Sequence, residues 1–207
     1  MYEIIKQYIR EHYYKDISIQ INPINTIGKI QGGYAFKSKD LLDELTNNKI
    51  LKIKNISASG IDIENTQCVC DEVANNVDKK FLLNRGDIII AMTGAELGKT
   101  GYLYGAKDNH FLNQRVGVVR GNDKFSNLYL NCIFLLDEMQ KLLNSKGYGS
   151  AQPNISSSDI ESIEIPIPDE IELKKFYEIV NPIYNKLILN SEENQYLIQL
   201  RDTLIPK

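Results

Sequence analysis

The sequence predicts an α+β protein: a globular domain with a twisted mixed β-sheet and short helices, followed by a long C-terminal coiled-coil helix. Short apolar and alternating segments, separated by glycine and asparagine, lack the regular strand–helix–strand period of a doubly wound sheet. From Leu173 onward, apolar residues recur at spacings of three and four. We therefore expect a globular domain over residues 1–167, with 1–26 as an N-terminal extension, and a helical spacer or dimerisation segment over residues 168–207.

Composition is typical of an ordinary globular protein. The 207 residues are 43% hydrophobic and 25% charged, enough for one or two domains with a full core. No apolar run approaches the roughly 18 residues of a membrane span, and the N-terminus lacks the apolar centre of a signal peptide. We expect a cytoplasmic protein in which Cys68, Cys70 and Cys132 are buried thiols rather than zinc ligands.

Charge is distributed unevenly along the chain. The net charge of −3 argues against a generic polyanion binder. Residues 28–158 nevertheless carry 16 Lys and Arg against 14 Asp and Glu, whereas residues 159–207 carry 5 against 10. The middle of the chain is therefore suited to face an anion, and the acidic C-terminal part to face water or a protein partner.

Local patterns in the first half predict short elements. Tyr2, Ile5, Ile9 and Tyr13 recur at helical spacing, which predicts an amphipathic helix over residues 2–13. Alternation and turn residues predict the remaining elements, which are strands over residues 17–23, 25–31, 50–56, 61–63 and 66–70, and a short helix after Lys39 capped by Ser38 or Asp40.

The second half contains a stronger strand signal, because Ile88–Ile90 form an apolar run after a Gly-Asp turn. Short strands are expected between Gly101 and Gly105 and over Asn113–Arg120. A helix capped by Ser126 is expected to run to about Ser145. The further predictions for this half are an apolar helix stripe of Leu128, Leu135, Met139 and Leu142, a helical turn started by Ser156 and Asp159, and a strand over residues 163–167.

Gly98-Lys99-Thr100 imitates the end of a phosphate-binding loop. That loop requires four residues between its first glycine and the Gly-Lys-Thr end, but only three separate Gly94 from Gly98, and Thr93 occupies the required glycine position. The loop must also open a helix whose amides hold phosphate, whereas a strand is expected next. The spacing therefore argues against nucleotide binding.

The C-terminal segment predicts one long helix. Asp169 is placed to cap it, with Glu172 three residues on, and residues 170–205 would extend roughly 50 Å. Pro182 is expected to bend it. The apolar residues at spacings of three and four form a seam along this helix, and packing against a partner helix accounts for a seam of this length. The alternative is that the helix folds back on its own domain. The apolar seam residues assigned to the partner are Leu173, Phe176, Val180, Ile183, Leu187, Leu197 and Leu204; Asn190, Asn194 and Arg201 are its polar positions.

The sequence offers no catalytic set. His12 and His110 stand in unrelated contexts, without a neighbour that suggests a triad. The segment from Asn181 to Tyr184 imitates the Asn-Pro-Pro-Tyr loop of adenine methyltransferases but lacks the second proline, and it lies inside the predicted helix. We expect a chain that catalyses nothing by itself, without a metal or cofactor of its own.

Four polar loops bounded by glycine stand out: GGYAFKSK, TGAELGKTG, DNHFLNQR and GYGSAQPN. They are rich in Asn, Gln, Lys, Arg and Thr, the side chains that contact phosphates and base edges of DNA. The residues that we assign to DNA contact are Lys37, Lys39, Thr93, Lys99, Arg115, Tyr148 and Gln152.

These loops, in this order, resemble the target recognition domain of specificity subunits from type I restriction–modification systems. The resemblance covers about residues 27–205 and includes a long helix directly after the Ile-Pro-Ile-Pro segment. It is carried by Gly32–Ser38, Gly86–Ile88, Thr93-Gly94 with Gly98, Leu112–Val116, Gly149–Ser156 and Ile165–Pro168.

The resemblance implies a non-catalytic subunit that reads part of a bipartite site in double-stranded DNA. In that family, the helices pair as a spacer and recruit methyltransferase (M) subunits, which modify adenine with S-adenosylmethionine, and a restriction (R) subunit. One recognition domain and one helix imply a half-subunit that forms a homodimer through its C-terminal helix. The alternative is a coiled-coil interaction or regulatory module without a role on DNA.

Overall fold

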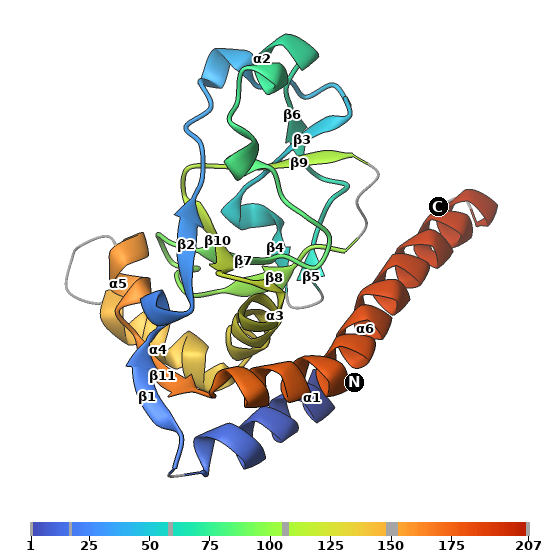
Figure 1. The fold of residues 1–207 in the computed structure, drawn as a ribbon. Helices are drawn as coiled ribbons and strands as arrows, with labels where there is room; N and C mark the ends of the chain where they lie inside the picture. Colours follow the sequence, from blue (N-terminus) through green and yellow to red (C-terminus); the bar gives the residue numbers. More distant parts are fainter. Residues whose placement is uncertain (1, 17, 58–59, 105–107, 148–152, 206–207) are drawn as a thin grey trace.

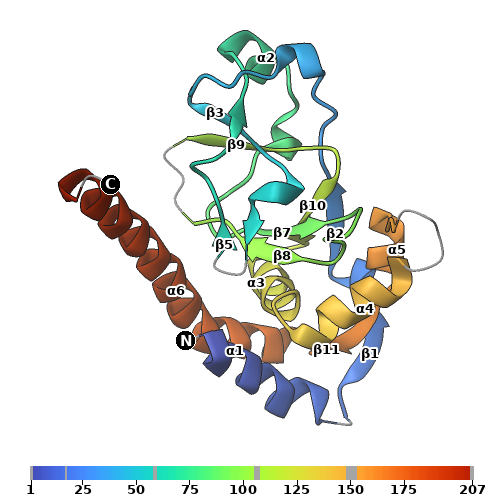
Figure 2. The same ribbon diagram turned by 180° about the vertical axis from the view of Figure 1, so that it is seen from behind.

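The computed structural model describes residues 2–16, 18–57, 60–104, 108–147 and 153–205. A globular body contains the β-sheets and the shorter helices. The long helix α6 packs along this body and then projects away from it (Figures 1 and 2). This mixed α+β architecture with a long C-terminal helix confirms the predicted fold class.

The central sheet consists of β2 (Gly28–Gly32), β7 (Ile88–Ala91), β8 (Thr100–Tyr102) and β10 (Val116–Gly121). Its order is β2-β10-β7-β8, and every neighbouring pair is antiparallel. The end of β2, the start of β10, the end of β7 and the start of β8 therefore lie at the same end of the sheet. Alternate residues of β7 enter two separate hydrophobic clusters, which explains why the run at 88–90 is apolar throughout.

A second sheet has the order β6-β3-β9. In it β3 (Asn48–Leu51) runs parallel to β9 (Asn109–Leu112) and antiparallel to β6 (Gln67–Cys68). The single mixed sheet expected from the sequence is thus divided into an antiparallel sheet and a mixed one. Two antiparallel ribbons complete the described strands: β1 (Gln20–Pro23) with β11 (Glu164–Ile167), and β4 (Ile56–Ser57) with β5 (Gly60–Ile61).

The long strand predicted over residues 50–56 is wrong, because a 3₁₀ turn over Ile53–Asn55 interrupts it. The cause is the Asn55 side chain, which is 1% exposed. Its Oδ1 accepts from the Lys52 amide at 3.0 Å, and its Nδ2 donates to the Asp62 carbonyl at 3.2 Å. A buried amide side chain that bonds local backbone favours a turn over the strand that alternation predicts.

Similar turns shorten other predicted elements. The strand expected over 25–31 begins with the 3₁₀ turn Ile24–Thr26, and the helix expected after Lys39 is only the 3₁₀ turn Ser38–Asp40. The strand expected from Asn113 starts at Val116, whose amide donates to the Asn113 carbonyl across a turn. The helix α2 (Asp71–Asn75) and the 3₁₀ turn Lys79–Phe81 were not predicted.

The N-terminal helix forms as predicted and belongs to the core. It consists of α1 (Tyr2–Ile9) and a π-helical turn over Arg10–Tyr14. Ile5, Ile9 and Tyr13 are 0–3% exposed and pack in the largest hydrophobic cluster. Residues 1–26 therefore include a helix that closes the body rather than a free extension.

The single helix expected from Ser126 to about Ser145 is wrong. The chain forms α3 (Lys124–Ile133) and α4 (Asp137–Gly147), because the amides of Leu135 and Leu136 bond carbonyls only three residues back. The N-cap is Asp123, and Ser126 is its reciprocal partner in a capping box. The break also shifts the apolar stripe, so that Leu142 is 40% exposed while Leu143 is buried.

The last two helices have the predicted caps. Ser156 and Asp159 form a capping box at the start of α5 (Ser157–Glu161). Asp169 Oδ1 accepts from the Glu172 amide at 2.8 Å at the start of α6 (Glu170–Leu204). Figures 1 and 2 show that α6 changes direction along its length. Pro182 lies inside α6 and removes one backbone hydrogen bond, which accounts for a bend.

The prediction of three buried thiols is correct for two of the cysteines. Cys68 and Cys132 are buried free thiols, but Cys70 is exposed, because it precedes α2 at the surface. Among the described residues, no helix combines the length and the apolar composition needed to cross a membrane.

Candidate nucleic-acid interface

Four polar segments gather at one end of the central sheet, where β2 and β7 end and β8 and β10 start. They are residues 33–37, 93–99, 113–115 and 153–156, and we call them together the loop edge. The sheet topology brings the first three together, since each one adjoins a strand at that end. The fourth, residues 153–156, precedes α5 and is held there by backbone hydrogen bonds to the end of β7.

Backbone hydrogen bonds join these segments to one another. The Gly94 amide donates to the Pro153 carbonyl at 2.9 Å, and the Ile155 amide donates to the Met92 carbonyl at 3.0 Å. The Met92 amide in turn donates to the Arg115 carbonyl at 3.1 Å. Segments that are 20 to 60 residues apart in sequence are therefore fixed relative to one another before any ligand binds.

Two glycines are needed to build this arrangement. A Cβ on Gly33 would lie 1.9 Å from the Asn113 carbonyl oxygen, so only glycine lets the two segments approach this closely. Gly94 has a φ of 80°, in the left-handed region that favours glycine. Gly33 and Gly94, which both belong to the resemblance motifs, thus have structural roles at the loop edge.

Arg115 is one of three predicted DNA-contacting residues that are exposed in the described part of the chain. It lies in the turn between β9 and β10, it is exposed, and its guanidinium has no hydrogen bond or ion pair within the described residues. Lys37 and Lys39 are also exposed, on the segment that follows β2. Cations that are not neutralised by a neighbour are available to contact phosphates or base edges.

Lys99 and Thr93 are less free than the sequence suggested. Lys99 Nζ lies 2.6 Å from Glu96 Oε2, so any contact to an anion requires this exposed ion pair to open. Thr93 is half-buried and bridges Asn154 in an isolated β-bridge. The two other candidates, Tyr148 and Gln152, lie outside the described residues.

An aromatic cluster supports the segment after β2. Tyr34 contacts Phe36 with ring centroids 4.9 Å apart and Phe81 at 5.4 Å. Phe81 follows Lys79 and Lys80, which are both exposed, and Lys80 Nζ lies 5.0 Å from the Phe81 ring. This contact places two lysines beside the loop edge that the sequence analysis missed, because only the Tyr34–Phe81 packing brings them there.

The loop edge has an excess of positive charge. Its four segments contain three cations, Lys37, Lys99 and Arg115, against the single carboxylate of Glu96. The chain as a whole has a net charge of −3. The positive charge is therefore concentrated at the loop edge, which also contains the exposed guanidinium group of Arg115.

The opposite end of the central sheet is closed by ion pairs. Arg120 Nη1 lies 2.5 Å from Asp87 Oδ1, and Arg120 Nη2 donates to the Leu82 carbonyl at 3.1 Å. Burial raises the pKa of Asp87, and the ion pair with Arg120 opposes this rise. Arg85 makes a second pair there with Glu192 of α6, at 2.6 Å. These groups satisfy one another and leave the loop edge as the end suited to a ligand.

The residues assigned to a partner helix separate into two groups. Leu173, Phe176, Val180 and Leu187 are 0–8% exposed in the largest hydrophobic cluster, where α6 contacts α1 and α3. For this half, the alternative holds: the helix folds onto its own domain, so these four side chains are not available to a partner.

The distal half of α6 is different. Leu197 is 55% exposed and Leu204 is 69% exposed, while Ile183, between the two halves, is half-buried. The other large apolar side chains that α6 and the residue after it expose in this half are Leu189, Tyr196, Ile198, Leu200 and Ile205. Of the predicted seam residues, those open to a partner helix therefore lie in the distal half.

The described residues contain no cluster of His, Cys, Asp and Glu suited to a metal ion. His110 is 2% exposed, and burial lowers its pKa to about 4. His12 stacks on Tyr8, with ring centroids 4.1 Å apart. Neither histidine belongs to the loop edge.

The fold defines a class of protein: an α+β domain with four polar segments at one end of its central sheet, continued by a long C-terminal helix. The sequence matches the type I restriction modification DNA specificity domain over residues 19–199, so the chain belongs to that family. The match begins after α1, so the N-terminal helix lies outside it.

Two curated relatives are specificity subunits of type I restriction enzymes. The chain is 26% identical over 191 residues to the MjaIX subunit of Methanocaldococcus jannaschii, which covers 91% of this chain and 43% of that protein. It is 25% identical over 154 residues to the HindI subunit of Haemophilus influenzae, and this match covers 69% of this chain and 33% of that protein. The chain thus spans less than half the length of these relatives.

Solved structures share the fold at low sequence identity. The S subunit of the type I restriction–modification system of M. genitalium has a TM-score of 0.58 and 16% identity, covering 98% of this chain and 47% of that one. The HsdS subunit of Thermoanaerobacter tengcongensis also has a TM-score of 0.58, with 12% identity, and the match covers 93% of this chain and 45% of that one.

Proposed function

We propose that this chain is the DNA-recognition half-subunit of a type I restriction–modification system and reads one part of a bipartite site. The observation that carries the proposal is the loop edge: four polar segments, held together by backbone hydrogen bonds, with three cations against one carboxylate. Membership of the specificity-domain family supports double-stranded DNA as the ligand of this edge.

The chemistry of the edge suits both parts of DNA recognition. Lysines at its border, such as Lys37 and Lys79, reach phosphates and position the protein without reading sequence. Gln114 and Arg115 lie exposed side by side in one turn. Arginine pairs in bidentate fashion with guanine and glutamine with adenine, and each good pair is worth roughly 1–3 kcal/mol of discrimination.

Catalysis is assigned to partner subunits. The chain would dock adenine methyltransferase (M) subunits, which bind S-adenosylmethionine, and a restriction (R) subunit would join the assembly. The distal half of α6 supports a homodimer, because Leu197 and Leu204 expose apolar surface that a second copy of the helix would cover. Two recognition domains related by such a pairing would read a symmetric split site.

Selection from a random duplex pool tests this proposal. The purified chain, at 50 mM salt, is expected to enrich a motif of two inverted half-sites separated by a fixed gap. The matched variant L197E/L204E loses the apolar distal surface and is expected to enrich a single half-site, because it binds as a monomer. Sedimentation of both proteins checks their oligomeric state.

A second candidate function, an interaction module without a role on DNA, is favoured only by the exposed distal helix. It predicts a dimer that enriches no sequence. A wild-type protein that sediments as a dimer and selects nothing from the pool would replace the proposed function with this alternative.

A further inference from the structure

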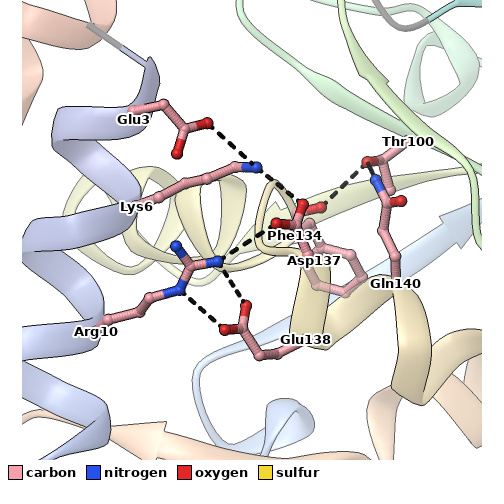
Figure 3. A network of polar contacts seen from close by, with 8 residues as sticks. All are labelled: Glu3, Lys6, Arg10, Thr100, Phe134, Asp137, Glu138 and Gln140. Atoms are coloured by element: carbon pink, nitrogen blue, oxygen red, sulfur yellow. Dashed lines mark hydrogen bonds and ion pairs between the residues drawn. The ribbon is translucent and has the colours of Figure 1, made fainter.

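The polar face of α1 is attached to the first turn of α4. Lys6 is 6% exposed, and its Nζ lies 2.9 Å from Asp137 Oδ1. Arg10 makes a bidentate pair with Glu138, at 2.9 Å from Nε and 3.0 Å from Nη2 (Figure 3). Asp137 and Glu138 are the first two residues of α4, where the helix dipole also stabilises negatively charged side chains. These ion pairs lower the pKa values of both carboxyl groups.

One turn further along α4, Gln140 connects this helix to the central sheet. Its Nε2 donates to Thr100 Oγ1 at 3.1 Å, and Thr100 Oγ1 donates to the Phe134 carbonyl at 3.1 Å (Figure 3). Thr100 is the first residue of β8 and directly follows the 93–99 segment of the loop edge. Phe134 caps the C-terminal end of α3. The side chain of Gln140 thus joins α4, β8 and α3 at one point.

The rest of α4 packs directly against the 93–99 segment. A Cβ on Gly98 would lie 2.7 Å from Asn144 Oδ1 and 3.1 Å from Leu143 Cβ. A Cβ on Gly147 would lie 2.7 Å from Leu97 Cδ2. Because packing this close leaves no free space, a displacement of α4 along its axis must also displace Leu97 and Gly98.

We infer that Lys6 and Arg10 are positioning residues for the loop edge: through Asp137, Glu138 and the α4 helix they hold the 93–99 segment in place. The inference rests on the proposed function for its effect on DNA binding, but not for its effect on the loop. Apolar side chains such as Ile5 and Ile9 keep α1 attached to the body without these charges. Attachment of α1 therefore does not depend on these ion pairs, and we assign them the role of fixing the position of α4 along its axis.

Arg10→Gln tests the inference, with amide hydrogen exchange as the first measurement. Exchange of residues 94–99 is expected to become roughly fivefold faster, as about 1 kcal/mol of local stability would produce. Amides of β7 and β10 should keep their rates. Glu138→Gln should give the same local pattern, and the double variant should add little to Arg10→Gln, because both changes break the Arg10–Glu138 pair and Arg10→Gln also breaks the longer pair with Asp137. Glu11→Gln, on the exposed face of the same helical segment, is the matched control and should change nothing.

The second measurement is the affinity of the same variants for the selected duplex and for a scrambled one. Arg10→Gln should weaken binding to the selected duplex roughly fivefold and leave binding to the scrambled duplex unchanged, since phosphate contacts do not require an ordered 93–99 segment. Unchanged exchange at 94–99, or exchange that rises equally throughout the core, would overturn the inference. Because exchange is measured without DNA, it decides the inference even if the wild-type chain binds no duplex.

Discussion

Phe176→Ala is expected to lower the free energy of unfolding by about 3–5 kcal/mol, as the removal of a buried phenylalanine usually does. Phe176 is 0% exposed, and its ring contacts Tyr129 at 5.4 Å and Tyr13 at 5.8 Å between centroids. The substitution leaves a cavity where α1, α3 and α6 meet. Urea titration, followed by far-ultraviolet circular dichroism, measures the loss.

Leu197→Ala is the matched control, because Leu197 lies on the same predicted seam of α6 but is 55% exposed. Its effect on the unfolding of the domain should stay within about 0.5 kcal/mol. The comparison separates two interpretations of one periodic pattern. If α6 were a free spacer along its whole length, both substitutions would leave domain stability unchanged and both would weaken dimerisation.

Arg120→Met is expected to cost about 3–5 kcal/mol, because it leaves the buried carboxylate of Asp87 without its cation. The Asp87 side chain is 6% exposed, and the donor that it keeps among the described residues is the Asn84 amide, which donates to Oδ2 at 2.7 Å. As a control, Arg201→Met removes the exposed pair with Asp202 and should cost about 0–1 kcal/mol.

The Arg120→Met penalty should also depend on pH. Burial already raises the pKa of Asp87, and loss of Arg120 raises it further. An acid whose pKa is raised on folding destabilises the fold above its folded pKa and no longer does so below its unfolded value. The penalty should therefore be complete near pH 7 and shrink as the pH falls towards 4. A penalty that stays constant over this range would show that Asp87 is not the cause.

Local chemistry made several elements predictable. The caps at Ser156 and Asp169 and the apolar run of β7 were readable because each depends on residues adjacent in sequence. The parallel pairing of β3 with β9 was not, since it joins segments about 60 residues apart. The break between α3 and α4 was also missed, because an apolar stripe continues through Leu135 and conceals it.

The seam of α6 illustrates a deeper ambiguity. A helix packed on its own domain and a helix in a coiled coil both place apolar residues at spacings of three and four. Only the position of α1 and α3 decides that Phe176 is core and that Leu197 is surface. Periodicity predicted the helix and its length correctly, but it could not assign its partner.

The sequence indicated the polar segments of the candidate site better than their individual side chains. The polar composition of the motifs indicated which segments gather, and the structure brings the described ones together. The place of Lys79 near the loop edge depends on the tertiary contact between Phe81 and Tyr34, whereas the ion pair of Lys99 with Glu96 joins residues only three apart in sequence. Arg115, Lys37 and Lys39 remain candidates for DNA contact, because each is exposed and without a side-chain partner among the described residues.

The most direct test of the account compares Lys37→Ala with Lys124→Ala. Each removes one exposed lysine, but Lys37 lies in the loop edge and Lys124 lies at the opposite end of the central sheet, at the start of α3. Affinity for a mixed-sequence duplex is measured from 50 to 200 mM salt. If the loop edge binds DNA, Lys37→Ala weakens binding and reduces the slope of log K against log salt by about 0.9, while Lys124→Ala changes neither. A reduced slope for Lys124→Ala with an unchanged slope for Lys37→Ala would contradict the assignment of DNA binding to the loop edge.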